Sequence, residues 1–316
     1  MKIFITREIP LPGIELLKKN GFEVSIYKKD NPIPRKELLN QVKDCDALIS
    51  LLSDRIDKEV IDQMDRCKVI ANYAVGFNNI DVDYAKSKGI IVTNTPDVLT
   101  DSTADLAMAL VLACARRITV AEKFVRDKEF VGWKPQLFLG MELRNKYFGI
   151  LGAGRIGTEV AKRAYAFGSK ILYYSNSKNN FLETKLNAKK ISLNAIIKKS
   201  DILSLHLPLN TETYHLLNEK NLILLKKSAI LINTARGEIV DEKLLISMLK
   251  HKKIFAAGLD VYEGEPNIKK EFYDLENVIL LPHIGSATIE ARDNMSLLAA
   301  KNVIAVLTGK RALTPV

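Results

Sequence analysis

The chain of 316 residues is long enough for two domains of ordinary size, each able to bury its own core. With 47% apolar and 27% charged residues it is typical of globular proteins, which excludes the disordered and fibrous classes. The formal net charge is +10, but Asp and Glu are interspersed among the lysines, so we expect a solvated surface and no nucleic-acid partner.

The three cysteines, Cys45, Cys67 and Cys114, are far apart and odd in number, which suits neither a disulfide framework nor a zinc site. We therefore expect no metal and a reducing compartment. The N-terminal stretch "MKIFITREIP" becomes charged before a signal-peptide apolar region develops. The longest apolar run, "LAMALVLACA", has roughly half of the ~18 residues that a membrane span needs. A cytoplasmic protein without membrane contact is predicted.

The first part of the chain alternates short apolar runs with amphipathic segments. The runs "KIFIT", "EVSIY", "DALISLL", "KVIANYA" and "IIVTN" are rich in Ile and Val, as buried parallel strands are. The segments "GIELLKKN", "RKELLNQV" and "KEVIDQM" between them have helical spacing of apolar residues. The pattern predicts a small doubly wound α/β domain.

Pro96 ends this region, and a long helical pattern follows residue 100. A second α/β series comprises "KYFGIL", "KILYYS", "DILSLHLP", "AILINT", "IFAAGLDV" and "NVILLP", and a final helix is expected in "ATIEARDNMSLLAAKNVIAVLTG". We expect one domain from residues 1–98 with 287–316, and a second from residues 99–286. This assignment places the last helix on the first domain.

The stretch "GILGAGRIG" carries Gly152, Gly154 and Gly157 between an apolar strand and a helix. The first glycine permits a tight turn, the second lets backbone amides approach a pyrophosphate, and the third lets helix and strand pack closely. A glycine turn can also be purely structural, but its place in a strand–helix–strand unit favours dinucleotide binding.

The next strand ends in "YYSNSK", where an NAD-binding sequence usually has an acidic residue for the adenosine ribose. Ser175 occupies that position, followed by Asn176, Ser177 and Lys178. None of the four repels a 2′-phosphate, and Lys178 attracts one. The alternative is a solvated turn that discriminates little between cofactors.

Three polar residues follow strands of the second series, in "INTARGEIVD", "GLDVYEGEP" and "LLPHIGSAT". Singly, Arg236 could be a helix cap, Glu265 a surface charge and His283 a packed histidine. Together, downstream of the glycine pattern, they form a Glu-His pair and a guanidinium at the edge where open α/β sheets bind ligands.

At this point the chain resembles the D-isomer-specific 2-hydroxyacid dehydrogenases, with the likeness running from "NYAVGFNNIDVDYA" and "VTNTPDVLTDSTADLA" to "AGLDVYEGEP" and "LPHIGSAT". Within that family it is most similar to glyoxylate/hydroxypyruvate reductases, through "GWKPQLFLG" and "TETYHLLN". The resemblance implies a flavodoxin-like substrate domain, a Rossmann cofactor domain, an active site in the cleft and a homodimer built on the long helix after residue 100.

Reduction of a 2-oxo acid places negative charge on the carbonyl oxygen, which needs a proton and electrostatic support. We expect His283 to be the general acid, with Glu265 favouring its charged form and fixing its orientation. We expect Arg236 to bind the substrate, because a guanidinium offers two parallel donors to a carboxylate.

The resemblance also implies substrate contacts from Leu52, Val75 and Gly76, and from Trp133 of the partner subunit. The implied cofactor contacts are the glycine loop and the residues at neighbouring strand ends: Gly152, Ala153, Gly154, Arg155, Ile156, Gly157, Ser175, Asn176, Ser177, Lys178, Pro208, Thr213, Thr234, Ala235, Asp260 and Gly285.

The similar reductases often have an arginine where this chain has Asn176. We therefore predict use of both NADPH and NADH, with a modest lean to NADPH and no metal. The predicted activity is reduction of small 2-oxo acids such as glyoxylate and hydroxypyruvate. The alternatives are another activity of the family (on phosphoglycerate, a lactate-type acid, formate or phosphite) and a catalytically silent nucleotide-sensing protein.

Overall fold

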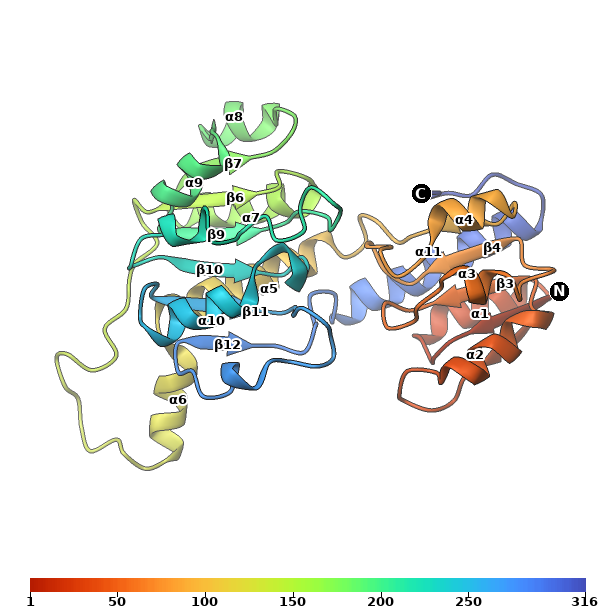
Figure 1. Ribbon diagram of the computed structural model, residues 1–316, viewed down its shortest axis with the longest axis horizontal. Coiled ribbons are helices and arrows are strands. Elements are labelled where there is room, and N and C mark those ends of the chain that lie inside the picture. Colours follow the sequence, from red (N-terminus) through yellow and green to blue (C-terminus); the bar gives the residue numbers. More distant parts are fainter. The chain divides into compact units, whose positions relative to one another are not determined.

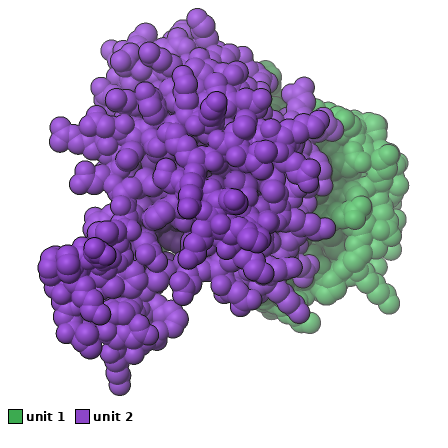
Figure 2. Space-filling view, turned by 60° about the vertical axis from the view of Figure 1, so that its left-hand side comes forward, with its two compact units in different colours: residues 1–99, 286–316 green, residues 100–285 purple.

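The computed structural model describes residues 1–316 and divides into two compact units, shown in separate colours in Figure 2. Unit 1 comprises Met1–Leu99 and Ser286–Val316, and unit 2 comprises Thr100–Gly285. Each unit contains one sheet in which all strand pairs are parallel. The predicted fold class, two doubly wound α/β domains, is confirmed.

Unit 1 has a five-stranded sheet of order β2-β1-β3-β4-β5, which is the flavodoxin-like order (Figure 1). Its central strands β3 and β4 are buried along their whole length, as expected for strands with both faces covered. The strands are β1 (Lys2–Ile5), β2 (Glu23–Ile26), β3 (Ala47–Ser50), β4 (Val69–Asn72) and β5 (Ile91–Thr93). The helices are α1 (Leu11–Lys19), α2 (Arg35–Gln41), α3 (Lys58–Ile61), α4 (Val82–Ser87) and α11 (Ile289–Leu307), with a 3-10 turn at Val42–Asp44.

The C-terminal helix α11 belongs to unit 1 and packs against α1 and β4. Ser296 in the middle of α11 fixes this contact, because its hydroxyl donates to the Pro10 carbonyl at 2.6 Å and accepts from the Gly13 amide at 3.1 Å. The Ser296 hydroxyl thus acts as both donor and acceptor at the start of α1, and it connects α11 to α1 although the two helices are far apart in the sequence.

Unit 2 has a seven-stranded sheet of order β12-β11-β10-β9-β6-β7-β8, in which six strands follow the Rossmann pattern (Figure 1). The strands are β6 (Tyr147–Leu151), β7 (Lys170–Tyr174), β8 (Lys189–Lys190), β9 (Ile202–Leu205), β10 (Ile230–Asn233), β11 (Ala256–Leu259) and β12 (Val278–Leu280). The helices are α5 (Thr100–Ala115), α6 (Ile118–Arg126), α7 (Arg155–Ala166), α8 (Asn180–Leu186), α9 (Leu193–Lys199) and α10 (Glu242–Lys250), with 3-10 turns at Leu222–Leu224, Gly237–Ile239 and Lys270–Phe272.

The long helix expected after residue 100 is in fact two helices, which corrects the sequence prediction. Helix α5 ends at Ala115, and Arg117 has φ of +53°, a left-handed conformation that ends a helix. The break falls where burial stops, because α5 packs its apolar face on β10 and β11 whereas no residue of α6 is buried. In Figure 1, α6 and the segment after it extend away from the sheet of unit 2.

None of the helices has both the length and the apolar composition needed to cross a membrane.

Candidate active site

The central strands of unit 2 end level with one another at the carboxyl edge of the sheet. Leu151 at the end of β6 is in register with Leu205 of β9, and Leu205 with Asn233 of β10. Asn233 is in register with Leu259 of β11. The residues after these strand ends therefore form one row along the edge: Gly152, His206, Thr234 and Asp260.

Two glycines, Gly152 in the loop after β6 and Gly157 in the first turn of α7, are required by packing. Gly152 has φ of +95°, and a Cβ atom there would lie 2.5 Å from the carbonyl oxygen of His206. A Cβ atom on Gly157 would lie 2.1 Å from the carbonyl oxygen of Gly152. Gly154 differs, since nothing lies within 4 Å of the position of its Cβ atom. The loop thus leaves open space above the second glycine, where a ligand can approach the backbone closely.

Helix α7 begins directly after this loop, with Gly154 as its N-cap and no side chain capping its first turn. The amides at a helix N-terminus carry partial positive charge and bind anions when no side chain satisfies them. The open space above Gly154 and the amides at the N-terminus of α7 together fit a pyrophosphate. Ile156 in the same turn packs its side chain on the apolar core, so a ligand at this loop meets its backbone.

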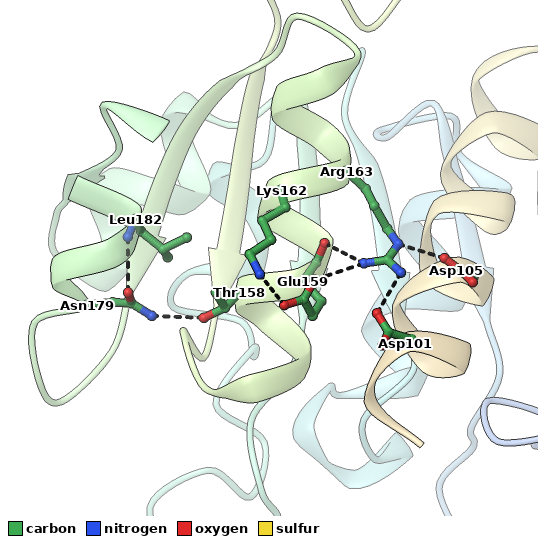
Figure 3. A network of polar contacts seen from close by, with 8 residues as sticks. All are labelled: Asp101, Asp105, Thr158, Glu159, Lys162, Arg163, Asn179 and Leu182. Carbon is green, nitrogen blue, oxygen red and sulfur yellow. Dashed lines mark hydrogen bonds and ion pairs between the residues drawn. The ribbon is translucent and has the colours of Figure 1, made fainter. Parts of the chain in front are cut away.

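Helix α7 is fixed to α5 by a network of ion pairs (Figure 3). Arg163 contacts Asp101 at 2.9 Å and Asp105 at 2.6 Å, both on α5, and Glu159 at 3.2 Å on its own helix. Lys162 pairs with the other oxygen of Glu159 at 2.5 Å. These contacts help to hold the helix that follows the glycine loop.

The loop after β7 runs from Ser175 to Lys178 and is largely exposed. Its backbone is held from the edge strand β8, because the ammonium of Lys190 donates to the Asn176 carbonyl at 2.8 Å. A short β8 was not predicted, since two adjacent lysines give no apolar signal. The loop has no carboxylate, and its surroundings include the Lys190 ammonium.

Asn179 connects this loop to the glycine loop and to helix α7, and Figure 3 shows its contact with Thr158 on α7. Its amide nitrogen donates to the Ala153 carbonyl at 3.0 Å and to the Thr158 hydroxyl at 2.8 Å. Its amide oxygen caps α8 by accepting from the Leu182 amide at 3.1 Å. Asn179 was not predicted as a site residue from the sequence, although an Asn directly before a helical pattern is a recognisable N-cap.

Further predicted cofactor residues lie after β9 and β10. The Thr213 hydroxyl donates to the Pro208 carbonyl at 2.6 Å, which closes the turn after β9. The Ala235 amide donates to the Asn233 side chain at 3.0 Å. The Thr234 hydroxyl is buried and has no hydrogen-bond partner, so this strand end has an unused polar group.

His283 and Glu265 form a hydrogen-bonded pair in unit 2. Nδ1 of His283 lies 2.8 Å from Oε2 of Glu265, with 29% and 34% of the two side chains exposed. The other carboxylate oxygen, Oε1, accepts from the Tyr262 amide at 2.9 Å. Burial works to raise the pKa of Glu265, but the hydrogen bond and charge of His283 outweigh it and hold this pKa below its usual value.

Asp260 holds the backbone that follows His283. Its two carboxylate oxygens accept from the Ile284 amide at 2.7 Å and the Gly285 amide at 2.8 Å. The residue is only 1% exposed, and burial raises the pKa of Asp260 against the lowering effect of these amides and of His283. A predicted cofactor contact is therefore also an anchor for the turn that carries His283.

Arg236 lies in an extended conformation after β10 and before the turn Gly237–Ile239. Its Nη1 donates to the Ala235 carbonyl at 2.6 Å, and its own carbonyl accepts from the Asn233 side chain at 2.8 Å. Burial lowers the pKa of Arg236, while the charges of Glu265 and Glu238 oppose the shift. A guanidinium stays protonated under these conditions, so a partly buried positive charge acts on Glu265 of the Glu265–His283 pair.

The predicted substrate residues of unit 1 lie in two loops that asparagine side chains hold together. Asn72 donates to the Gly76 carbonyl at 2.8 Å, and Asn94 donates to the Val75 carbonyl at 2.8 Å. The amides of Val75 and Gly76 have no hydrogen-bond partner within the chain. Asn79 donates to the Leu51 carbonyl at 3.1 Å and thereby steadies the loop of Leu52.

Trp133 lies in the segment between α6 and β6, and 83% of it is exposed. Its neighbour Val131 is 82% exposed, Phe130 57% and Leu139 65%. Several exposed apolar side chains within one segment are typical of surfaces that associate with another molecule.

Comparison with known proteins shows the family. The family model described as "D-isomer specific 2-hydroxyacid dehydrogenase, NAD binding domain" matches residues 108–285. A glyoxylate reductase of Thermococcus litoralis is 50% identical over 313 residues, covering 98% of this chain and 94% of that protein. A glyoxylate reductase of Pyrococcus horikoshii is also 50% identical, over 98% of this chain and 93% of its own.

Solved structures similar to this chain support the same family. The TT0316 protein of Thermus thermophilus superimposes with a TM-score of 0.94 at 41% identity, covering the whole of both chains. An NADPH-dependent glyoxylate/hydroxypyruvate reductase of Sinorhizobium meliloti, in complex with NADP and malonate, gives a TM-score of 0.87 at 32% identity over 100% of this chain and 96% of that one. The chain belongs to the D-isomer-specific 2-hydroxyacid dehydrogenase family, and it is an enzyme that uses a nicotinamide cofactor.

Proposed function

We propose that this enzyme reduces small 2-oxo acids, glyoxylate and hydroxypyruvate among them, to 2-hydroxy acids. The observation that carries the proposal is the hydrogen-bonded pair of His283 and Glu265, under the influence of the Arg236 charge. Sequence identity of about half with curated glyoxylate reductases over nearly the whole chain supports the same substrate class.

The bound reduced nicotinamide supplies the hydride for the carbonyl carbon. Arg236 binds the carboxylate and carbonyl oxygen of the oxo acid through its parallel N–H donors. His283 donates the proton from Nε2 to the carbonyl oxygen, since Nδ1 faces Glu265. Glu265 holds the ring orientation and stabilises the protonated imidazole.

The cofactor is held by the loop of Gly152, Gly154 and Gly157, by the first turn of α7 and by residues at the strand ends. We propose that NADPH and NADH are both used, with a modest lean to NADPH. Support comes from the absence of a carboxylate at Ser175, from the charges of Lys178 and Lys190, and from the NADP complex of the Sinorhizobium meliloti relative.

The decisive experiment follows absorbance of the reduced cofactor with purified protein and a panel of acids. Glyoxylate and hydroxypyruvate should be turned over, whereas 2-oxoacids with long side chains, phosphohydroxypyruvate, formate and phosphite serve as comparisons. Catalytic efficiency for NADPH should exceed that for NADH by a few-fold. A ~100-fold preference for NADH, equivalent to about 2.7 kcal/mol, contradicts the proposed cofactor use.

We further propose a homodimer to which α5, α6 and the exposed segment after α6 contribute, with Trp133 reaching the substrate site of the partner subunit. The exposure of Trp133 and Val131 supports this assembly. The three free, buried cysteines support a location in the cytoplasm, where thiols stay reduced.

A further inference from the structure

Glu242, the first residue of α10, is a buried carboxylate that the proposed chemistry does not use. Only 2% of the residue is exposed. Its Oε1 accepts from the Glu263 amide at 2.6 Å, and its Oε2 pairs with the Lys269 ammonium at 2.7 Å. A buried charge is costly unless it is paired and hydrogen-bonded, and here both oxygens have partners. Both partners lie on the segment after β11, which also carries Glu265.

Lys269 extends the contact into a chain of charges. Its ammonium also pairs with Oε2 of Glu263 at 2.6 Å, and Oε1 of Glu263 lies 2.9 Å from Nε2 of His215. The hydrogen bond from Lys269 lowers the pKa of Glu263, with burial opposing it and His215 assisting. One lysine thus holds two carboxylates, one from α10 and one from the segment that leads to Glu265.

The same segment contacts the backbone beside Arg236. A Cβ atom on Gly237 would lie 1.9 Å from the carbonyl carbon of Tyr262 and 2.2 Å from the nitrogen of Glu263. The backbone amide of Tyr262 donates to Oε1 of Glu265, and the hydroxyl of Tyr262 donates to the Leu281 carbonyl at 2.8 Å. A shift at residues 262 and 263 would therefore displace the carboxylate that faces His283.

We propose that Glu242 and Lys269 are positioning residues, which fix the segment of residues 262–265 and act on proton donation only through Glu265. They touch neither of the proposed reacting groups. The inference rests on the proposed function of the Glu265–His283 pair, and it adds two residues that the sequence pattern does not assign to the site.

The test uses the full-length enzyme and a double-mutant cycle. Glu242→Gln removes the charge at nearly constant volume, and Lys269→Met removes the ammonium. Each should lower kcat by ~10-fold while leaving KM for the oxo acid within about twofold, because the substrate-binding Arg236 is unchanged. In the Glu265→Gln background the same substitutions should change kcat by less than about twofold. The matched controls are Glu271→Gln and Lys270→Met, exposed neighbours that should stay within about twofold of the parent enzyme.

A purely structural role predicts a different pattern. If Glu242→Gln lowers kcat by the same factor in both backgrounds, or leaves kcat unchanged in the folded protein, the positioning role is wrong. Lys269→Met provides an independent result if Glu242→Gln fails to fold, and Lys269→Arg should restore most of the activity that Lys269→Met loses.

Hydrogen exchange separates this inference from the proposed function. Amides of residues 262–265 should exchange faster in Glu242→Gln than in the parent enzyme and in Glu271→Gln, whatever the substrate. Unchanged exchange overturns the positioning role even in an active enzyme. Faster exchange in Glu242→Gln, together with a parent enzyme that reduces no oxo acid, supports the structural part and overturns only the proposed function.

Discussion

His283 has φ of +54°, a left-handed conformation that costs a residue other than glycine about 1 kcal/mol. The turn keeps this conformation because Asp260 binds the two following amides at 2.7 and 2.8 Å. Glu265 then meets the imidazole at Nδ1. The orientation of the proposed proton donor is therefore set by two carboxylates, one acting on its backbone and one on its ring.

The first prediction concerns the pair itself. His283→Ala should lower kcat/KM for the oxo acid by ~10²–10⁴-fold, because a positioned general acid contributes about this factor. Glu265→Gln should have a smaller effect, since the imidazole remains but loses the carboxylate. Steady-state kinetics give the values, and cofactor binding followed by nicotinamide fluorescence should be unchanged in both variants. Full turnover by His283→Ala would refute the assigned mechanism.

The second prediction concerns His206, whose lowered pKa should make the stability of the protein depend on pH. Burial lowers the pKa of His206 to about 3, so the imidazole is neutral in the folded protein at neutral pH. Between about pH 6.5, the ordinary value, and pH 3 the unfolded chain binds more protons at this residue than the folded chain does. The free energy of unfolding therefore decreases through this contribution as the pH falls below about 6.5.

His206→Asn should remove that contribution, so its Tm should fall less than that of the parent protein between about pH 7 and 4.5. Scanning calorimetry at several pH values measures the difference. The exposed His251 provides the control, as His251→Asn should follow the parent curve. Parallel curves for the parent and His206→Asn would show that this histidine does not titrate differently on unfolding.

At the level of elements, the strand–loop–helix unit β6–α7 places its glycines for different reasons. Gly157 lies against the Gly152 carbonyl, with a Cβ position 2.1 Å from that oxygen, whereas the Cβ position of Gly154 is open. Gly157 is therefore required by the folding of the chain, whereas Gly154 is required by the ligand that approaches the loop. The side chain of Asn179 binds the Ala153 carbonyl of the glycine loop, and the side chain of Lys190 on β8 binds the Asn176 carbonyl of the loop after β7. Side chains from two segments therefore hold the two loops.

A matched pair of substitutions separates these reasons. Gly157→Ala should lower the free energy of unfolding by ~1–3 kcal/mol, because backbone must move to admit the methyl group. Gly154→Ala should change it by less than about 0.5 kcal/mol but raise KM for the cofactor by ~10-fold, because the methyl group occupies the approach to the amides. Urea unfolding and cofactor titration measure the two effects. Unaltered cofactor KM in Gly154→Ala would show that no phosphate approaches there.

At the level of the whole molecule, the segment after α6 carries apolar side chains that the single chain leaves exposed. Trp133 and Val131 are each more than four-fifths exposed, although both are residues that folding usually covers. Helix α6 buries none of its residues within the chain. A second copy of the chain is the proposed cover for this surface.

The corresponding prediction is that the protein is a dimer at micromolar concentration in light scattering after size exclusion. Trp133→Ser combined with Val131→Ser should shift the equilibrium toward monomer by removing apolar area from the contact. Tyr273→Ser alters another exposed side chain of unit 2 and should leave the dimer intact. A monomeric parent protein, or a dimer that the double substitution does not weaken, contradicts the proposed assembly.

The strands were predictable because buried parallel strands are continuous apolar runs, and all the predicted runs contain strands of the two sheets. The edge strand at Lys189 and Lys190 gave no such signal. The division of the helix after residue 100 was also missed, since Arg116 and Arg117 are good helix formers and neither glycine nor proline marks the break. The helix ends where packing against the rest of unit 2 ends, because α5 has buried residues and α6 has none.

The sequence by itself determined the fold class, the glycine loop and the candidates Arg236, Glu265 and His283, because strand periodicity and polar residues after strands are local patterns. Only the tertiary structure decided which carboxylate oxygen faces His283, that Asp260 anchors its turn, and that Glu242 contacts the segment of Glu265. These contacts join residues 18 to 24 positions apart, and their geometry depends on strands ending level in one sheet. Local patterns fix which residues reach that edge, and packing fixes how they meet.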